Sequence, residues 1–195
     1  MKFLVLNKKR LSIVLIIIGL IIILIGIQSN FQERLNYTSL IQNNINSLKE
    51  YEALNKKFKY KLPEEWITDE KVFSGEEIIY HNDFHSKDLS IHGFVQVWNL
   101  KKDLKIYLEE SKEISEMQNE CMDYSLSEIK IKNNKAYLVQ YNMITSKNKK
   151  YKSYEYFIKN KNKFFRFSFF VEEKNFKENM PTVFTTIVNT FNYNE

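Results

Sequence analysis

The amino-acid sequence predicts an α+β domain, an antiparallel sheet with helices packed on both faces, preceded by one N-terminal transmembrane helix. Residues 11–27 carry no charge. Residues 57–172 contain short runs in which apolar and polar residues alternate, as they do in half-buried strands. Two further segments repeat apolar residues at helical spacing, and each needs an apolar surface to cover.

The segment LSIVLIIIGLIIILIGI, residues 11–27, predicts the membrane span. Its only polar residue besides two glycines is Ser12. At about 1.5 Å per residue it is roughly 25 Å long, near the lower limit for crossing a bilayer. A cleaved signal peptide is the alternative. The following GIQSNFQ is a poor cleavage site and no cysteine lies nearby for lipidation. We therefore favour an uncleaved signal anchor.

Charge is unevenly distributed along the chain. Residues 1–10 hold four basic residues, and residues 1–27 contain no acid. Positive charge on this side of the span predicts a cytoplasmic tail at residues 1–10 and an extracytoplasmic location for residues 28–195. The rest of the chain is nearly neutral, which argues against nucleic-acid binding. Cys121 is the only cysteine, so no intramolecular disulfide is expected.

Residues 28–56 predict a juxtamembrane helix. Residues 31–55 lack Gly and Pro, and Ile41, Ile45 and Leu48 recur at helical spacing. This narrow apolar stripe can pack on the chain's own domain or allow self-association through residues 31–55. It is too short and too polar for a coiled coil.

The spacing of apolar residues changes from helical to alternating at residue 57, where the extracytoplasmic domain, residues 57–195, is expected to begin. In KFKYKL, Phe58, Tyr60 and Leu62 share one face, which predicts a strand. EEIIYHNDF and LSIHGFVQVWN then predict two strands joined by a two-residue turn at Ser86–Lys87.

A helix, a meander and a second helix complete the predicted domain. Asn99 is the expected N-cap of NLKKDLKIYLEESKEISEM. Four strand-like runs follow with short turns between them, which favours an antiparallel meander: MDYSLSEIKI, KAYLVQYNMIT, YKSYEYFIK and KFFRFSFFVE. Pro181 suits the first turn of the closing helix, ENMPTVFTTIVNTF.

This order of elements, with FKYKLPEEW near its start and VFTTIVNTF at its end, resembles the PsbP-like fold over roughly residues 57–193. The shared signals are a Tyr-x-Leu-Pro-x-x-Trp entry, here Tyr60 to Trp66, and a closing helix that ends in an aromatic residue. Membrane-anchored bacterial relatives look most similar, and most lack a known activity. Plant members assist the oxygen-evolving complex of photosystem II, but no residue here carries that role over. The resemblance implies a fold and a non-enzymatic role.

The three histidines of the chain fall within HNDFHSKDLSIH, residues 81–92. A two-residue turn would set His81 opposite His92 and Asp83 opposite Ser90. Cross-strand Cβ atoms lie about 5 Å apart, close enough for two imidazoles to hold one ion. The sequence thus suggests a metal site of His81, Asp83 and His92. The alternative is an exposed polar hairpin face with incidental histidines.

Other chemistry is poorly supported. Cys121 is more simply explained as a small buried hydrophobe than as a nucleophile. The adjacent pairs Glu64–Glu65 and Glu76–Glu77 diverge on extended backbone, and there is no Gly-rich phosphate loop. We therefore expect neither catalytic activity nor a cofactor.

Aromatic residues are the more unusual feature. In FFRFSFF, residues 164–170, Phe165, Phe167 and Phe169 share one face. Phe164, Arg166, Ser168 and Phe170 occupy the other. We favour a sheet buried beneath helices on both faces. The alternative is an exposed aromatic patch that binds a protein or glycan.

Together these features predict a membrane-anchored, extracytoplasmic binding or assembly module of the cell envelope, with an envelope protein as its partner. The second hypothesis is a small-ligand or metal sensor that uses the His81/His92 hairpin face.

Overall fold

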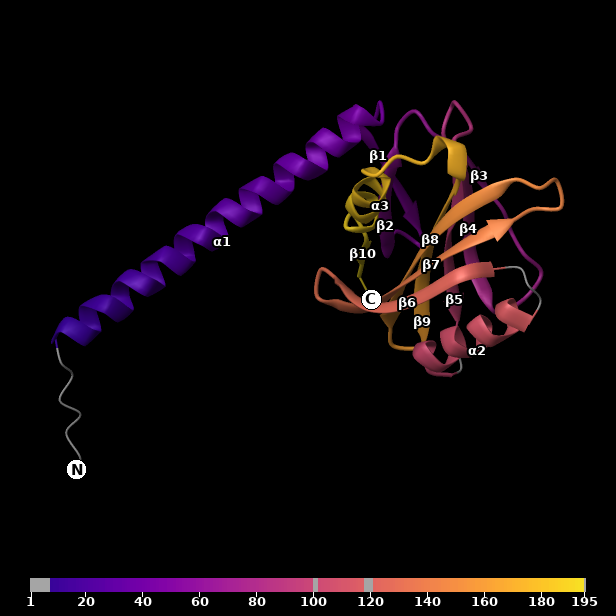
Figure 1. Ribbon diagram of the computed structural model, residues 1–195. Coiled ribbons are helices and arrows are strands. Elements are labelled where there is room, and N and C mark those ends of the chain that lie inside the picture. Colours follow the sequence, from indigo (N-terminus) through magenta and orange to yellow (C-terminus); the bar gives the residue numbers. More distant parts are fainter. Residues whose placement is uncertain (1–7, 100–101, 118–120, 195) are drawn as a thin grey trace.

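The computed structural model describes residues 8–99, 102–117 and 121–194, which form a long helix joined to an α+β domain (Figure 1). The helices are α1 (Lys8–Gln42), α2 (Leu104–Met117), the 3-10 helix η1 (Glu173–Asn175) and α3 (Met180–Val188). The strands are β1 (Leu48–Ala53), β2 (Phe58–Pro63), β3 (Ile67–Glu70), β4 (Ile78–His85), β5 (Ile91–Asn99), β6 (Cys121–Ile131), β7 (Asn134–Ile144), β8 (Lys150–Asn160), β9 (Lys163–Glu172) and β10 (Asn192–Tyr193).

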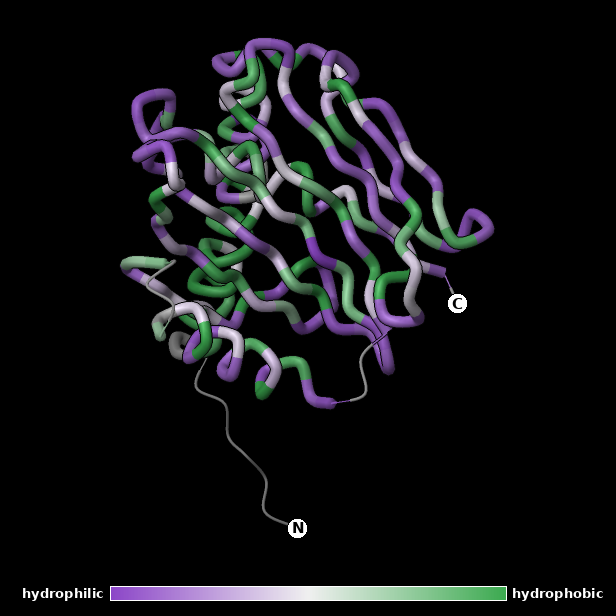
Figure 2. The backbone as a smooth tube through the Cα atoms, turned by 90° about the vertical axis from the view of Figure 1, so that its right-hand side faces the viewer, coloured by the Kyte–Doolittle hydropathy of each residue, from purple (hydrophilic) through white to green (hydrophobic). Residues whose placement is uncertain are grey.

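The strands form two antiparallel sheets. The large sheet has the order β3-β4-β5-β9-β8-β7-β6, and the small one has the order β1-β2-β10. Strands β6 to β9 follow one another as the expected meander. Hydrophilic and hydrophobic residues alternate along the strands of the large sheet (Figure 2), so each strand presents different chemistry to its two faces. The predicted α+β class is confirmed.

One face of the large sheet holds the main core, beneath α3 and the small sheet. Phe165, Phe167 and Phe169 of β9 are fully buried there, as their alternation predicts. The ring of Phe169 stacks on Phe184 of α3, with centroids 4.4 Å apart. From the small sheet, Phe58 packs on Phe165 at 4.8 Å. Aromatic burial of this kind contributes large apolar areas and specific ring geometry.

The other face of the large sheet is covered by α2 at one end only. Leu104 and Leu108 of α2 are buried against Phe157 and Phe164. Helices therefore lie on both faces, as expected. The expected N-cap is wrong, because Asn99 ends β5 and the Asp103 carboxylate accepts the first-turn hydrogen bond from the Lys105 backbone N–H at 2.9 Å.

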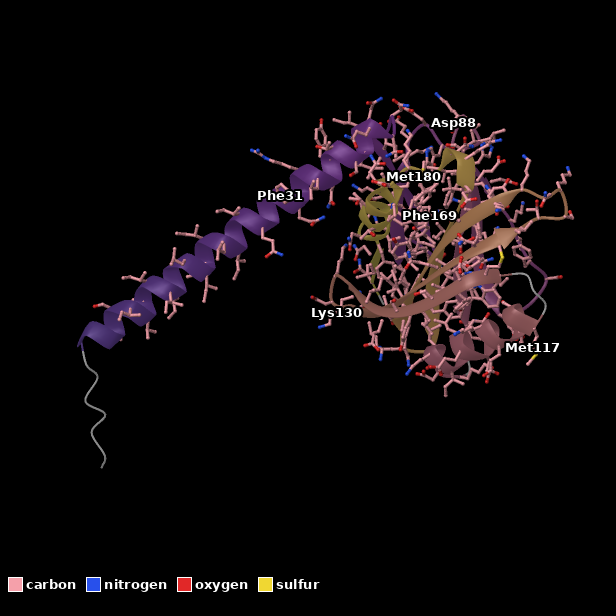
Figure 3. The ribbon with its side chains drawn as sticks, in the orientation of Figure 1. Phe31, Asp88, Met117, Lys130, Phe169 and Met180 are labelled. Atoms are coloured by element: carbon pink, nitrogen blue, oxygen red, sulfur yellow. The ribbon has the colours of Figure 1, made fainter. Side chains whose placement is uncertain are left out.

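Helix α1 runs unbroken through the predicted span and beyond it. Its apolar part is long enough to cross a membrane, and the most apolar stretch of the candidate span, Leu11–Gln42, is not buried against the domain. Phe31 lies where α1 stands clear of the domain (Figure 3) and is 61 % exposed.

The prediction of helix over residues 28–56 is wrong after Gln42. Asn44 has a φ of 59°, the left-handed conformation that commonly ends a helix. Residues Leu48–Ala53 then form β1 and pair with β2. Tyr51 of β1 stacks on Tyr60 of β2 at 5.5 Å, so the cross-strand partner decides the conformation of this segment.

The end of α1 is docked onto α3. Leu40 and Ile45 reach the main core, and Ser39 is buried. The amide of Asn179 accepts a hydrogen bond from Asn43 at 3.1 Å and donates one to Gln42 at 2.6 Å. The domain is therefore fixed to the last turn of the long helix rather than tethered by a loop (Figure 1).

Candidate functional site

The part of the large sheet that α2 leaves uncovered presents its side chains in rows that cross the strands. Directly opposed residues define three rows: Ile67, His85, His92 and Phe170; Asp69, Asp83, Phe94, Ser168 and Glu155; and His81, Gln96 and Arg166. Residues in one row are cross-strand neighbours and interact directly. We call these three rows together the open face.

The register of the β4–β5 hairpin differs from the prediction. Residues 86–90 form a five-residue loop, which sets His81 opposite Gln96 and His85 opposite His92. The Asp88 side chain stabilises this wider loop by accepting hydrogen bonds from Ser86 and Ser90. The shift is four residues, an even number, so the side chains from Tyr80 to His85 and from Ile91 to Val97 keep the faces that alternation predicts, whereas a bulge between Ile78 and Tyr80 places Ile78 opposite Trp98.

The predicted pairing of His81 with His92, on which the metal site depended, is therefore wrong. His81 is 5 % exposed and lies in a different row. Gln96 donates to its Nδ1 at 2.8 Å, and its Nε2 lies 2.7 Å from the Asp83 carboxylate. Both ring nitrogens are thus engaged by protein groups. Within residues 8–99, 102–117 and 121–194, no cluster of three His, Cys, Asp or Glu side chains is placed to hold a metal.

Six rings form a continuous series across the open face, which we call the ring series. Its centroid distances run from 4.9 to 5.9 Å, within the range of favourable aromatic contact, through Tyr151, His92, Phe170, Phe94, His81 and Phe73. Phe164 of the predicted aromatic patch is buried by α2, whereas Phe170 stays partly exposed. The patch exists only at the uncovered end of the sheet.

A cavity of about 450 Å³ opens beside the ring series. Met143 of β7 and Ile67 of β3 both line it, although four strands separate β3 from β7 in the sheet, so the sheet curls around this space. The β7–β8 hairpin extends past the neighbouring strands on one side (Figure 1). The full lining is Ile67, Thr68, Asp69, Asp83, Phe84, His85, His92, Gly93, Phe94, Met143 and Phe170.

Two carboxylates give the cavity its charge. Asp69 and Asp83 are directly opposed across β3 and β4, and the Lys71 ammonium contacts both. Burial works to raise the pKa of Asp83, but hydrogen bonds from Lys71 and His81 outweigh burial and hold that pKa below its usual value. Asp83 is therefore ionised at neutral pH.

His92, one of the two histidines that line the cavity, is uncharged at neutral pH. The His92 ring packs against Phe170 and Tyr151, although the residue as a whole is exposed to solvent. Burial, with a smaller contribution from the nearby His85, lowers the pKa of His92 below its usual value. The His85 Nδ1 lies 3.0 Å from the Ser86 carbonyl oxygen, to which it donates.

A buried ion pair supports the floor of the open face. The Glu155 carboxylate, 3 % exposed, accepts hydrogen bonds from Arg166 at 2.6 Å, Tyr141 at 2.7 Å and Ser168 at 2.5 Å. The Arg166 guanidinium also lies 4.8 Å from the centre of the Phe94 ring. Sequence reasoning placed Arg166 on this face but missed Glu155, whose alternation within YKSYEYF was the available signal.

The fold and the open face define an α+β sheet protein carried on one apolar N-terminal helix. The solution structure of a cyanobacterial PsbP from Synechocystis matches with a TM-score of 0.56 and 13 % identity, over 76 % of this chain and 93 % of that one. A crystal structure from Bacteroides thetaiotaomicron matches with a TM-score of 0.52 and 14 % identity, over 75 % of this chain and 48 % of that longer one.

These likenesses establish the fold: the chain has a PsbP-like fold, as its sequence suggested. No protein-family model and no curated protein matches the chain. At such low identities the likeness carries no residue role across.

Proposed function

We propose that the protein is a single-pass, membrane-anchored binding or assembly module of the cell envelope, without catalytic activity, and that its open face holds an envelope protein. Residues 1–10 are cytoplasmic and residues 28–195 extracytoplasmic. The observation that carries this proposal is the aromatic-walled cavity at the one part of the large sheet where α2 gives no cover.

The chemistry of the open face favours binding over catalysis. His81 and Asp83 resemble a base with its orienting acid, but Gln96 and Asp83 occupy both nitrogens of a buried ring. A general base needs a free nitrogen within reach of a substrate proton. The Glu155 carboxylate is likewise saturated by its three donors. These groups rigidify the surface from which a partner is bound.

The anchor supports the proposed location. The apolar stretch at residues 11–27 carries no charge, and basic residues precede it, which favours a cytoplasmic N-terminus. The second half of α1 continues as a stalk to the domain. A rigid stalk suits a module that presents its surface at a set height above a membrane.

The second candidate function is a small-ligand sensor. Its support is the size of the cavity, about 450 Å³, which lies within the range of small-molecule sites. The hypothesis of a metal sensor lacks geometric support, because His81 and His92 are not cross-strand partners.

Site-specific photo-cross-linking tests the proposal in the cells that naturally make the full chain. A photoreactive phenylalanine replaces Ile67 at the cavity rim, 54 % exposed, and Ile114 on α2, 56 % exposed, serves as the matched control. We expect a discrete adduct with one envelope protein from position 67 and none from position 114. Equal adducts from both positions, or none from position 67, would contradict the proposal.

The same method tests self-association. The photoreactive residue at Phe31, on the stalk, should yield a covalent dimer if copies pair through residues 31–55, and monomer only if they do not.

A further inference from the structure

We propose that the cavity recognises an organic cation on an apolar arm, and specifically a lysine or arginine side chain in an extended segment of the partner protein. This inference rests on the proposed function and deepens it, because it assigns the chemical class of the group that the open face binds.

The walls of the cavity suit the apolar arm. Phe94, Phe170 and His92 present ring surfaces, and Ile67 and Met143 add aliphatic surface. Alkyl stems of long basic side chains pack well on such surfaces, and aromatic faces attract cations directly. Phe94 already binds a guanidinium in this manner, since Arg166 lies 4.8 Å from the centre of its ring.

The charge of the cavity selects the sign of the ligand. Asp69 and Asp83 line it, whereas its lining contains no Lys or Arg. Lys71 contacts both carboxylates from outside the lining, so the cluster keeps one uncompensated negative charge. An anionic ligand would meet repulsion here, and a neutral one would gain nothing from the spare carboxylate.

The neighbouring strand edge indicates a polypeptide as the source of the cation. In the described part of the chain, β3 ends the large sheet and pairs only with β4. Its other edge can therefore pair with an extended segment, which would place alternate side chains on the same face as Ile67 and Asp69. Those side chains would lie at the mouth of the cavity.

Peptide titration of the full chain in detergent micelles tests this recognition. The probes are acetyl-Val-Thr-X-Thr-Val amides with X as lysine, norleucine or glutamate, and calorimetry measures their affinities. We expect the lysine peptide to bind about tenfold more tightly than the norleucine peptide, and the glutamate peptide most weakly. Equal affinities for lysine and norleucine would overturn the inference.

Variants locate the binding. Asp69→Asn, which removes a largely exposed carboxylate, should weaken the binding of the lysine peptide about fivefold and leave the affinity for the norleucine peptide unchanged. Phe170→Leu should weaken both peptides. Glu109→Gln on α2 is the matched control and should change neither. An unchanged affinity of Asp69→Asn for the lysine peptide would contradict the assignment.

Butylamine, a free amine, distinguishes the two possible sources of the bound ammonium group, which are a lysine side chain in a polypeptide and a small free amine. We expect it to bind more weakly than the lysine peptide, because it cannot pair with β3. Equal affinities would refute a polypeptide ligand and assign the cavity to free amines. Capture of a partner from position 67 without binding of the lysine peptide would refute this inference and leave the proposed function standing. Absence of both results would refute both proposals.

Discussion

Gly93 offers the sharpest test of how the open face is built. It lies in β5, where its backbone lines the cavity. A Cβ atom at this position would sit 1.8 Å from the Ser168 carbonyl oxygen and 2.8 Å from Cζ of Phe84. Gly93 does not have a positive φ, so the cost of Gly93→Ala is steric rather than conformational. The carbonyl belongs to the backbone of β9 and cannot rotate aside.

The magnitude follows from that backbone contact. Overpacking a well-packed core commonly costs about 1–3 kcal/mol. Here β5 and β9, the central strands of the large sheet, must separate, so we expect the upper end, about 3 kcal/mol. In a chain of this size, that loss corresponds to a fall of about 6–12 °C in the unfolding midpoint.

The assay is urea unfolding of the full chain in micelles, followed by the fluorescence of Trp66 and Trp98. Gly75→Ala is the matched control, because no atom lies within 4 Å of its added Cβ, and it should cost less than about 0.5 kcal/mol. Adding Phe84→Leu to Gly93→Ala should not restore the stability, because it leaves the backbone contact in place and also removes the packing of the Phe84 ring on Trp66 and Phe169. A cost for Gly93→Ala equal to that of Gly75→Ala would refute the reasoning.

Three further predictions concern stability. Arg166→Leu should lower the free energy of unfolding in urea by about 3–5 kcal/mol, because it leaves the Glu155 carboxylate buried without its cation. Adding Glu155→Leu should recover most of that loss. A double variant whose loss equals the sum of the two single losses would contradict this prediction. Burial raises the pKa of Tyr80 and of Tyr156 to about 12, so the contribution of the two protonated tyrosines to the free energy of unfolding is complete below pH 10 and is lost as pH rises from 10 to 12. Urea unfolding at constant temperature across that pH range measures this loss, and a free energy of unfolding that does not change with pH would count against the prediction. Asn179→Ala removes two amide hydrogen bonds to the end of α1 and should weaken that junction by about 1 kcal/mol, seen as faster hydrogen exchange in the last turn of α1; unchanged exchange would show that the apolar contacts suffice.

Local patterns in the sequence predicted most of the fold. The alternation in KFKYKL and FFRFSFF assigned the buried face of β2 and β9 correctly, because the period of a strand depends only on neighbouring residues. The apolar spacing of VFTTIVNTF likewise identified α3 and its buried face. For residues 43–53 the local pattern predicted the wrong structure. Ile45 and Leu48 fit a helix, but pairing of Leu48–Ala53 with β2, invisible in the local sequence, makes a strand.

The site was harder to predict because it depends on distant contacts. The pairing of His81 and His92 required the loop length, which the hydrogen bonds of Asp88 decide. From Tyr80 onward the faces of both strands were still correct, since the register error was an even number of residues. Nothing local relates Ile67 to Met143, and only the curl of the whole sheet brings them to one cavity.

The unbroken course of α1 makes the protein sensitive to helical phase. Gln42 is held by α3, so the domain cannot turn independently of the helix that carries it. In the proposed membrane setting, one residue inserted after Gln32 would raise the domain by only about 1.5 Å but rotate it by about 100° around the helix axis. Seven inserted residues would raise it by about 10 Å and return the open face nearly to its original bearing. A partner fixed in the same membrane would tolerate the longer insertion better than the shorter one.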